Sequence, residues 1–218
     1  MRRGISLVRF LMPAVLEALG ACGGSATQRA AVVPTPIVPA GPRPLEIHPT
    51  AKSYRIDPKR SRFEIFGTDV FGAEHRMTFK TWQARVTLDP TPRITARIET
   101  ASVVVDFPGA TSTVQAHVLE VDRFPLATLD ATLARTSGPP DEHVVEGIAE
   151  LHGVQKTLRF FGTLTEEGDA YLFRTSFVVA RSEFGIHYAP IEPFVREDVR
   201  IVVDALARPE RVEAEELP

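Results

Sequence analysis

The chain has 218 residues, of which 44% are hydrophobic and 24% are charged, and this composition is typical of a globular protein that closes its own core. The formal net charge is −3, and no cluster of basic residues with interleaved aromatic residues occurs, which argues against a nucleic-acid partner. A single cysteine, Cys22, excludes an intramolecular disulfide and a cysteine-rich metal site.

The amino-terminal segment has the layout of a secretory signal. Arg2 and Arg3 precede an apolar run over residues 10–19, which is shorter than the ~20 residues that span a bilayer. The following Leu19-Gly20-Ala21-Cys22 resembles the lipobox of bacterial lipoproteins. That resemblance implies that residues 1–21 are a signal peptide and that acylated Cys22 joins the protein to a membrane of the bacterial cell envelope, facing the periplasm. Gly23 in place of Asp after the cysteine resembles the sorting signal that some bacteria use for the outer membrane, which implies the outer membrane over the inner one. The alternative is an ordinary signal peptide with an incidental cysteine.

Residues 22–52 form the predicted tether. The segment is rich in Gly, Ala, Thr and Pro and cannot bury a core. Its proline density favours extended polyproline II, in which residues 23–50 would reach ~80 Å at about 3.1 Å per residue. We therefore interpret it as a spacer between the membrane and a folded domain.

Short stretches rich in β-branched and aromatic residues follow, at intervals of roughly ten, and predict one domain over residues 53–208, with a flexible acidic tail over residues 209–218. The expected strands are Ser53–Ile56, Arg62–Phe66, Arg76–Lys80, Ala84–Leu88, Ile94–Ile98, Ser102–Val105, Leu126–Ala134, Val144–Leu151, Thr157–Leu164, Ala170–Val179 and Val199–Leu206.

Several of these strands alternate between an apolar and a polar face. Ile94, Ala96 and Ile98 face one side of their strand, opposite Thr95 and Arg97. Strands with one buried face pack as a sandwich or curl into a barrel, and the pattern alone does not choose between the two. Residues 111–120 break the β pattern and predict a short helix, because apolar and histidine residues recur there at i, i+3 and i+4.

Catalytic and metal-binding motifs are not evident. The six histidines are scattered without the spacing of a zinc helix, and neither a Gly-x-Ser-x-Gly elbow nor a glycine-rich phosphate loop occurs. The sequence therefore predicts no enzyme, no metal and no cofactor, with a hydrolase or lyase of unrecognised type as the alternative.

Four ordered blocks carry a family resemblance. Tyr54-Arg55-Ile56-Asp57-Pro58, Leu151-His152-Gly153-Val154-Gln155-Lys156-Thr157, Arg181-Ser182-Glu183-Phe184-Gly185-Ile186 and Arg196-Glu197-Asp198-Val199-Arg200-Ile201 resemble the YceI-like family of polyisoprenoid-binding proteins. The resemblance implies an all-β fold, an extended antiparallel lipocalin-like β-barrel with one short helix. Its channel would hold an isoprenoid, such as a quinone or a prenyl phosphate, or another amphiphilic lipid. Family members commonly carry Arg-Asp ahead of the helix histidine, where Val114-Gln115 stand here.

Inward-facing apolar residues are the expected ligand lining, and three polar residues are the candidates for contact with a head group. The predicted lining residues are Phe63, Ile65, Phe79, Ile94, Ile98, Leu158, Phe160, Phe173, Phe177 and Phe184, and the polar candidates are His117, Arg181 and His152. A structural or stress-related envelope protein with a barrel filled by its own side chains is the alternative. The sequence leaves the oligomeric state open.

Overall fold

The computed structural model describes residues 28–29, 31–32, 53–88 and 91–210. The predicted signal peptide, Cys22, most of the tether and most of the acidic tail lie outside these ranges. The strands are β1 (Gln28–Arg29), β2 (Ala31–Val32), β3 (Ser53–Ile56), β4 (Arg62–Asp69), β5 (Glu74–Phe79), β6 (Trp82–Thr87), β7 (Arg93–Glu99), β8 (Val103–Val105), β9 (Leu126–Arg135), β10 (Glu142–Leu151), β11 (Val154–Glu167), β12 (Ala170–Ala180) and β13 (Val195–Pro209). The helical segments are η1 (Thr100–Ser102), α1 (Ala110–Thr113), η2 (Val114–Val118) and η3 (Arg181–Phe184).

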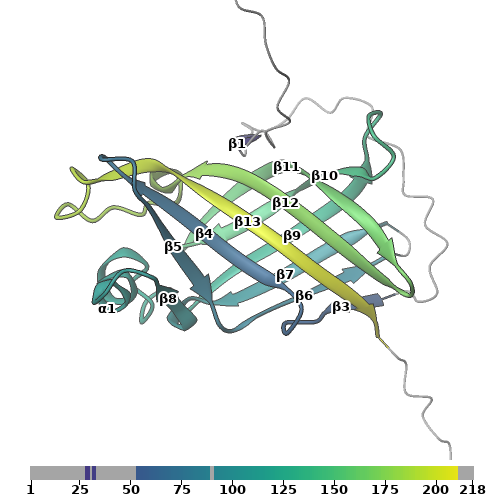
Figure 1. Cartoon of the computed structure of the whole chain (residues 1–218), viewed down its shortest axis with the longest axis horizontal. Helices are drawn as coiled ribbons and strands as arrows, with labels where there is room; N and C mark the ends of the chain where they lie inside the picture. The colour runs from purple at the N-terminus through teal and green to yellow at the C-terminus, as the bar shows by residue number, and fades with distance from the viewer. Residues whose placement is uncertain (1–27, 30, 33–52, 89–90, 211–218) are drawn as a thin grey trace, which may run out of the picture.

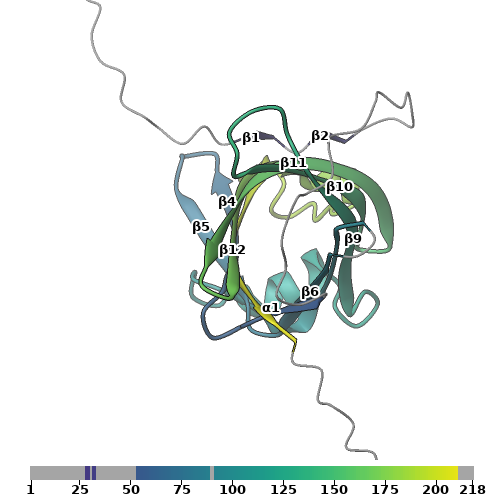
Figure 2. The same ribbon diagram turned by 90° about the vertical axis from the view of Figure 1, so that its right-hand side faces the viewer.

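Eight strands close into a barrel, in the order β12-β11-β10-β9-β7-β6-β3-β13, and the pairing of β13 with β12 completes the ring (Figures 1 and 2). β13 makes this closure possible through its length. Its residues 198–207 follow β12 along one edge, while its other edge pairs first with β4 and then with β3. β4, β5 and β8 extend the wall beside this edge. The expected all-β barrel is therefore confirmed, and the sandwich is not formed.

Every strand that the sequence predicts is present, and the alternation places apolar side chains inside. In β7 the side chains of Ile94, Ala96 and Ile98 are half-buried while those of Thr95 and Arg97 are exposed. The main core lies between the strands and includes Leu133, Val145, Leu158 and Phe160. β11 and β13 run several residues beyond the predicted ends, because polar residues at the ends of long hairpins still pair their backbone groups.

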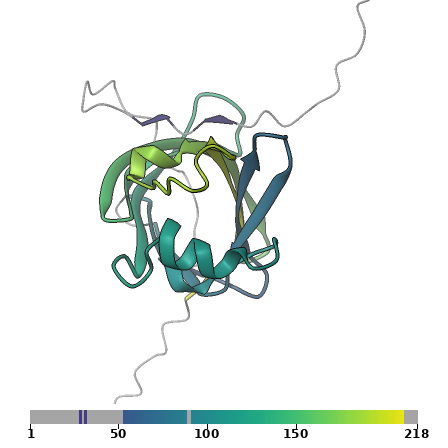
Figure 3. The same cartoon turned by 90° about the vertical axis from the view of Figure 1, so that its left-hand side faces the viewer.

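One end of the barrel carries the helical segments. Figure 3 shows α1 on one side of this end and the yellow-green segment with η3 on the other. The predicted helix is present as α1 followed directly by η2, a single π-helical turn in which the Leu119 N–H donates to the Val114 oxygen (2.8 Å). Val114 and Val118 pack against the core. Among the described residues, no helix is long and apolar enough to cross a membrane.

The first two strands are a departure from the expected tether. Gln28 and Arg29 pair in parallel with β12, and Ala31 and Val32 pair antiparallel with β11. The sequence gives no alternation over so short a stretch, so only the partner strands reveal that this part of the segment lies along the barrel. β1 lies over the part of β12 that leads into η3, and Figure 1 shows it beside the barrel wall near the label of β11.

Candidate functional site

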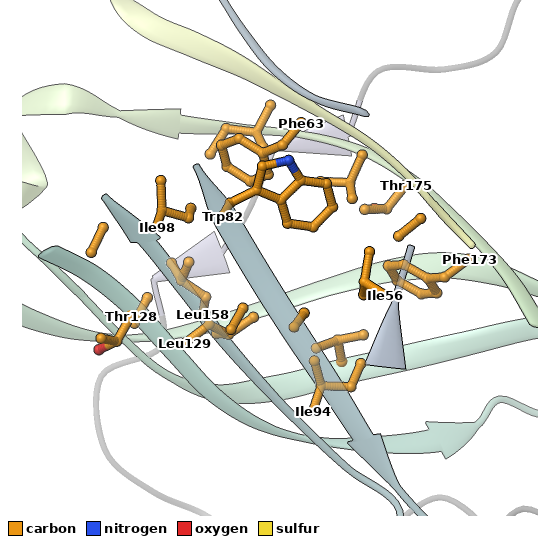
Figure 4. Close-up of a pocket in the computed structure, with 18 of the residues that line it drawn as sticks. Ile56, Phe63, Trp82, Ile94, Ile98, Thr128, Leu129, Leu158, Phe173 and Thr175 are labelled. Carbon is orange, nitrogen blue, oxygen red and sulfur yellow. The ribbon is translucent and has the colours of Figure 1, made fainter. Parts of the chain in front are cut away.

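An apolar cavity of about 190 Å³ runs inside the barrel. Ten strands contribute to its lining, and Figure 4 shows side chains of β3, β4, β6, β7, β9, β11 and β12 converging on it around Trp82. The lining consists of Tyr54, Ile56, Phe63, Ile65, Phe79, Trp82, Ala84, Val86, Leu88, Ile94, Ala96, Ile98, Thr100, Ala127, Thr128, Leu129, Leu133, Val145, Ala149, Glu150, Leu151, Leu158, Phe160, Leu164, Tyr171, Phe173, Thr175, Phe177, Val179, Phe184, Ile201, Val203, Ala205 and Ala207.

Small side chains in the wall help to keep the cavity open. Six alanines, from β6, β7, β9, β10 and β13, leave space that a barrel of this strand number can otherwise fill with its own side chains. An engineered cavity of about 150 Å³ is large enough to bind benzene, whereas sites for drug-sized ligands hold about 300–1,000 Å³. In this conformation the barrel therefore has room for a slender apolar group, and a bulkier ligand would require lining side chains to move.

Two threonine hydroxyls of the lining already have partners in the wall. The Thr100 hydroxyl donates to the Phe124 carbonyl oxygen (2.7 Å), and the Thr175 hydroxyl donates to the Phe161 carbonyl oxygen (2.6 Å). Each hydroxyl has a single proton to donate, so these two cannot also donate a hydrogen bond to a ligand. Most of the lining is aliphatic or aromatic, so the cavity offers a ligand mainly dispersion contacts.

Tyr171 and Glu150 are the ionisable residues of interest in this lining. Burial, with smaller contributions from Tyr54 and Glu166, raises the pKa of Tyr171 to about 12, so the phenol stays neutral at physiological pH. The Tyr171 hydroxyl lies 3.5 Å from the Glu166 carboxylate, and its ring packs edge-on against Tyr54. The Glu150 carboxylate accepts a hydrogen bond from the Gln155 amide (2.8 Å). The half-buried Glu150 and its exposed neighbour Thr128 mark a place where the lining reaches the surface.

All ten predicted apolar lining residues line the cavity. Whether each contacts a ligand stays a prediction. Sequence reasoning missed the contributions of β3, β6, β9, β10 and β13, which include Trp82, Leu133 and Val203. The signal was present, because Trp82, Ala84 and Val86 alternate in β6, as do Ile201, Val203, Ala205 and Ala207 in β13.

The three polar candidates lie outside this lining. His117 is exposed and stacks on Tyr188 with ring centroids 5.2 Å apart. Arg181 donates to the Ile186 carbonyl oxygen (3.1 Å) and lies within 4 Å of the carboxylates of Glu192 and Glu197. These contacts give Arg181 a role in holding the segment after β12. Contact of either residue with a head group remains a prediction that this conformation does not show.

His152 also serves the wall rather than the cavity. Its Nε2 lies 2.9 Å from Glu120 Oε2, and its ring packs at 4.2 Å from that of Phe124. Arg123 first, and His152 to a lesser degree, lower the pKa of Glu120. His152 thereby ties the β10–β11 turn to the segment that follows η2. Among the described residues, no group of three or more His, Cys, Asp or Glu side chains is arranged to hold a metal ion.

The barrel domain matches the model of a known protein family. The model of the YceI-like domain matches residues 54–207. The chain belongs to the YceI-like domain family. The match begins at β3 and ends within β13, so it covers the whole ring of eight strands.

Solved structures share the YceI-like fold at low sequence identity. BcnA of Burkholderia cenocepacia is 19% identical, with a TM-score of 0.64 over 69% of this chain and 98% of that one. A polyisoprenoid binding domain from Saccharophagus degradans, implicated in plant cell wall breakdown, is 11% identical, with a TM-score of 0.63 over 72% and 98% of the two chains. The YceI protein of Campylobacter jejuni is 16% identical, with a TM-score of 0.51 over 62% and 85%. No curated protein sequence matches this chain.

Proposed function

We propose that this chain binds one long apolar ligand of isoprenoid type inside its barrel and carries out no reaction on it. The observation that carries the proposal is the continuous apolar cavity, whose lining comes from every strand of the closed ring. The description of the similar Saccharophagus degradans domain as polyisoprenoid-binding supports the ligand class. A quinone or a prenyl phosphate would combine such a chain with a polar head.

The chemistry of the lining supports binding over catalysis. General acid–base catalysis requires a positioned titratable group within hydrogen-bond reach of the reacting atom. The lining has one carboxylate, Glu150, which Gln155 already engages, and it has no histidine, lysine or arginine. The hydroxyls of Thr100 and Thr175 donate to backbone carbonyls instead of to a base. A barrel filled by its own side chains fits less well, because about 190 Å³ stays open.

Native lipid and intrinsic fluorescence test this proposal together. Protein purified without detergent is extracted and its lipids are identified by mass spectrometry, and we expect an isoprenoid in molar proportion to the protein. Trp82, the one tryptophan of the chain, lines the cavity, so binding of added farnesol should change its fluorescence. A protein that carries no lipid and whose Trp82 emission is unaffected by farnesol, geranylgeraniol and a short ubiquinone would overturn the proposal.

We also propose that the protein is exported and held at a membrane through acylated Cys22. The lipobox-like Leu19-Gly20-Ala21-Cys22 and the basic, then apolar, segment before it support this proposal. Because two acyl signals anchor stably where one chain is marginal, the mature protein should remain with membranes. The outer membrane is the proposed location, since Gly23 follows the cysteine.

The Cys22→Ser variant tests the anchor. We expect the wild-type protein in the membrane fraction and the variant in the soluble fraction, and intact mass should show the acyl groups on wild-type protein only. Ser25→Ala is the matched control, because it lies close to Cys22 but outside the lipobox. If Cys22→Ser fractionates as the wild type does, the proposed anchor is wrong.

A further inference from the structure

The barrel wall has a lateral slot between β11 and β12. These strands pair only from Thr163↔Arg174 to Glu167↔Ala170, although β11 begins at Val154 and β12 continues to Ala180. The outer edges of the same strands are paired over much longer stretches, β11 with β10 and β12 with β13. Residues 154–162 of β11 and 175–180 of β12 therefore have no ladder joining them directly.

Both ends of the slot have a local structural cause. At the closed end, the strands approach so tightly that a Cβ on Gly162 would lie 2.5 Å from the Phe173 ring, and the Thr175 hydroxyl bonds to the Phe161 carbonyl oxygen. Beyond this point the strands diverge. At the other end, Gly185 after η3 lies close to Val154. A Cβ added to Gly185 would lie 3.6 Å from Val154 Cγ2. The slot is therefore a bounded opening and not a frayed strand end.

The slot lies directly over the cavity. Phe160 of β11 and Phe177 of β12 stack across it, with ring centroids 4.1 Å apart and an interplanar angle of 14°. Both rings, together with Leu158 and Val179, line the cavity. The two stacked rings therefore separate the slot from the ligand space.

A segment of the chain's own tether occupies the slot. β1 pairs with the β12 edge at Gln28↔Phe177 and Arg29↔Val178, and β2 pairs with the β11 edge at Leu158↔Val32 and Arg159↔Ala31. We call β1 and β2 together the strap. Extended segments add to unpaired sheet edges through main-chain hydrogen bonds, and two paired residues on each edge make the strap a short and weakly held addition.

We propose that the slot is a lateral port for the apolar ligand and that the strap closes it. This inference rests on the proposed binding function and adds the route of entry. Only residues 23–27 separate Cys22 from the strap, so at a maximum of ~3.6 Å per residue an anchored cysteine would lie within ~20 Å of the slot. An anchored protein would accordingly present this port, rather than a barrel end, close to the lipid from which its ligand comes.

A disulfide across the strap tests the port in the full-length chain carrying Cys22→Ser, which removes the one native cysteine. Ala31→Cys and Arg159→Cys occupy paired positions, and antiparallel partners have the Cα separation that a disulfide needs. We expect the disulfide to form on oxidation and to slow farnesol association, followed by Trp82 fluorescence, by tenfold or more relative to the reduced form. Ala31→Cys with Gln155→Cys is the control, because the two positions are out of register.

A second variant opens the port. Replacing residues 28–32 with alternating Gly and Ser should raise the acrylamide quenching constant of Trp82 at least twofold and speed farnesol association. The same replacement at residues 39–43 of the tether should change neither. Equal quenching in the two replacement variants, failure of the disulfide to form, or equal association rates in the locked and reduced forms would each overturn the port.

The two proposals fail in different ways. If no form of the protein responds to farnesol, the proposed function is wrong, and acrylamide quenching still decides whether the strap closes the slot. If farnesol binds equally fast to the locked and reduced forms, the function stands and the ligand enters elsewhere, for example where the lining reaches the surface at Thr128 and Glu150.

Discussion

Gly147 in the middle of β10 shows how close the barrel strands pack. It pairs with Ala131 of β9 and with Leu158 of β11. A Cβ at this position would overlap the Asp130 carbonyl oxygen and the Ala131 Cα, which are main-chain atoms and cannot move aside without disturbing the ladder. Only a residue without a side chain fits here.

We expect Gly147→Ala to lower the free energy of unfolding by about 1–3 kcal/mol, because an inserted methyl group forces backbone shifts in a packed region. Urea unfolding followed by circular dichroism measures the change. Gly67→Ala in β4 is the matched control, since its Cβ would meet nothing within 4 Å. Equal stability of the two variants would contradict the proposed overlap.

His143 at the start of β10 is a buried histidine with one unpartnered nitrogen. It is 2% exposed, and its Nδ1 lies 2.9 Å from the Asp141 carbonyl oxygen. Because a carbonyl only accepts, Nδ1 carries the proton, and no partner faces Nε2 within the described residues. Burial lowers the pKa of His143 and so favours the neutral ring in the folded protein.

This burial predicts a loss of stability on mild acidification. As the pH falls through about 6.5, the unfolded chain takes up a proton at His143 more readily than the folded chain does, so the free energy of unfolding falls, by at most about 1.4 kcal/mol per pH unit. Urea unfolding at several pH values should show a shallower slope for His143→Asn. His117→Asn is the control, because the His117 ring is exposed and stacks on Tyr188. A wild-type slope in His143→Asn would exclude His143 as the cause.

At the scale of elements, the hairpin of β10 and β11 turns on two residues. Leu151 pairs with Val154, and between them His152 and Gly153 both have positive φ angles, of 54° and 72°. Positive φ at both central positions defines the type I′ turn that matches the twist of paired strands. The family motif around His152-Gly153 therefore has a backbone reason. A Cβ on residue 153 would also lie 2.7 Å from the Phe124 ring.

The turn predicts a difference between two substitutions. His152→Val and His152→Asn both remove the contacts with Glu120 and Phe124, but asparagine tolerates left-handed backbone and a β-branched residue does not. We expect the valine variant to be less stable than the asparagine variant by about 1–2 kcal/mol, as measured by urea unfolding. Indistinguishable unfolding midpoints would mean that the turn relaxes to another conformation.

At the scale of the whole molecule, the cavity depends on small residues in the wall. Ala96 lies at the centre of β7, paired with Ala84 and Leu129, and lines the cavity. Ala96→Leu places three further carbon atoms in the ligand space, so we expect farnesol affinity, measured by Trp82 titration, to fall tenfold or more. The neighbouring Thr95→Leu faces outward and should leave the affinity unchanged. If Ala96→Leu binds farnesol as tightly as the wild type does, the ligand does not occupy the part of the cavity beside Ala96.

The alternation of β7, β11 and β12 by itself determined which side chains face the dry side of each strand, since side-chain direction in a strand depends only on residue parity. For this reason the ten apolar residues expected to line a ligand site all line the cavity. The short helix was predictable too, because its period is local.

Only the tertiary structure decided between barrel and sandwich, because closure depends on β13 pairing with strands far away in sequence. The placement of His117, Arg181 and His152 outside the lining was likewise not predictable, since partners such as Tyr188, Glu197 and Phe124 come from other segments. The slot and its strap were not predictable from the sequence either. No periodicity of β11 or β12 shows where their pairing stops, because the contacts that bound the slot, such as Gly162 with Phe173 and Gly185 with Val154, join residues of different segments.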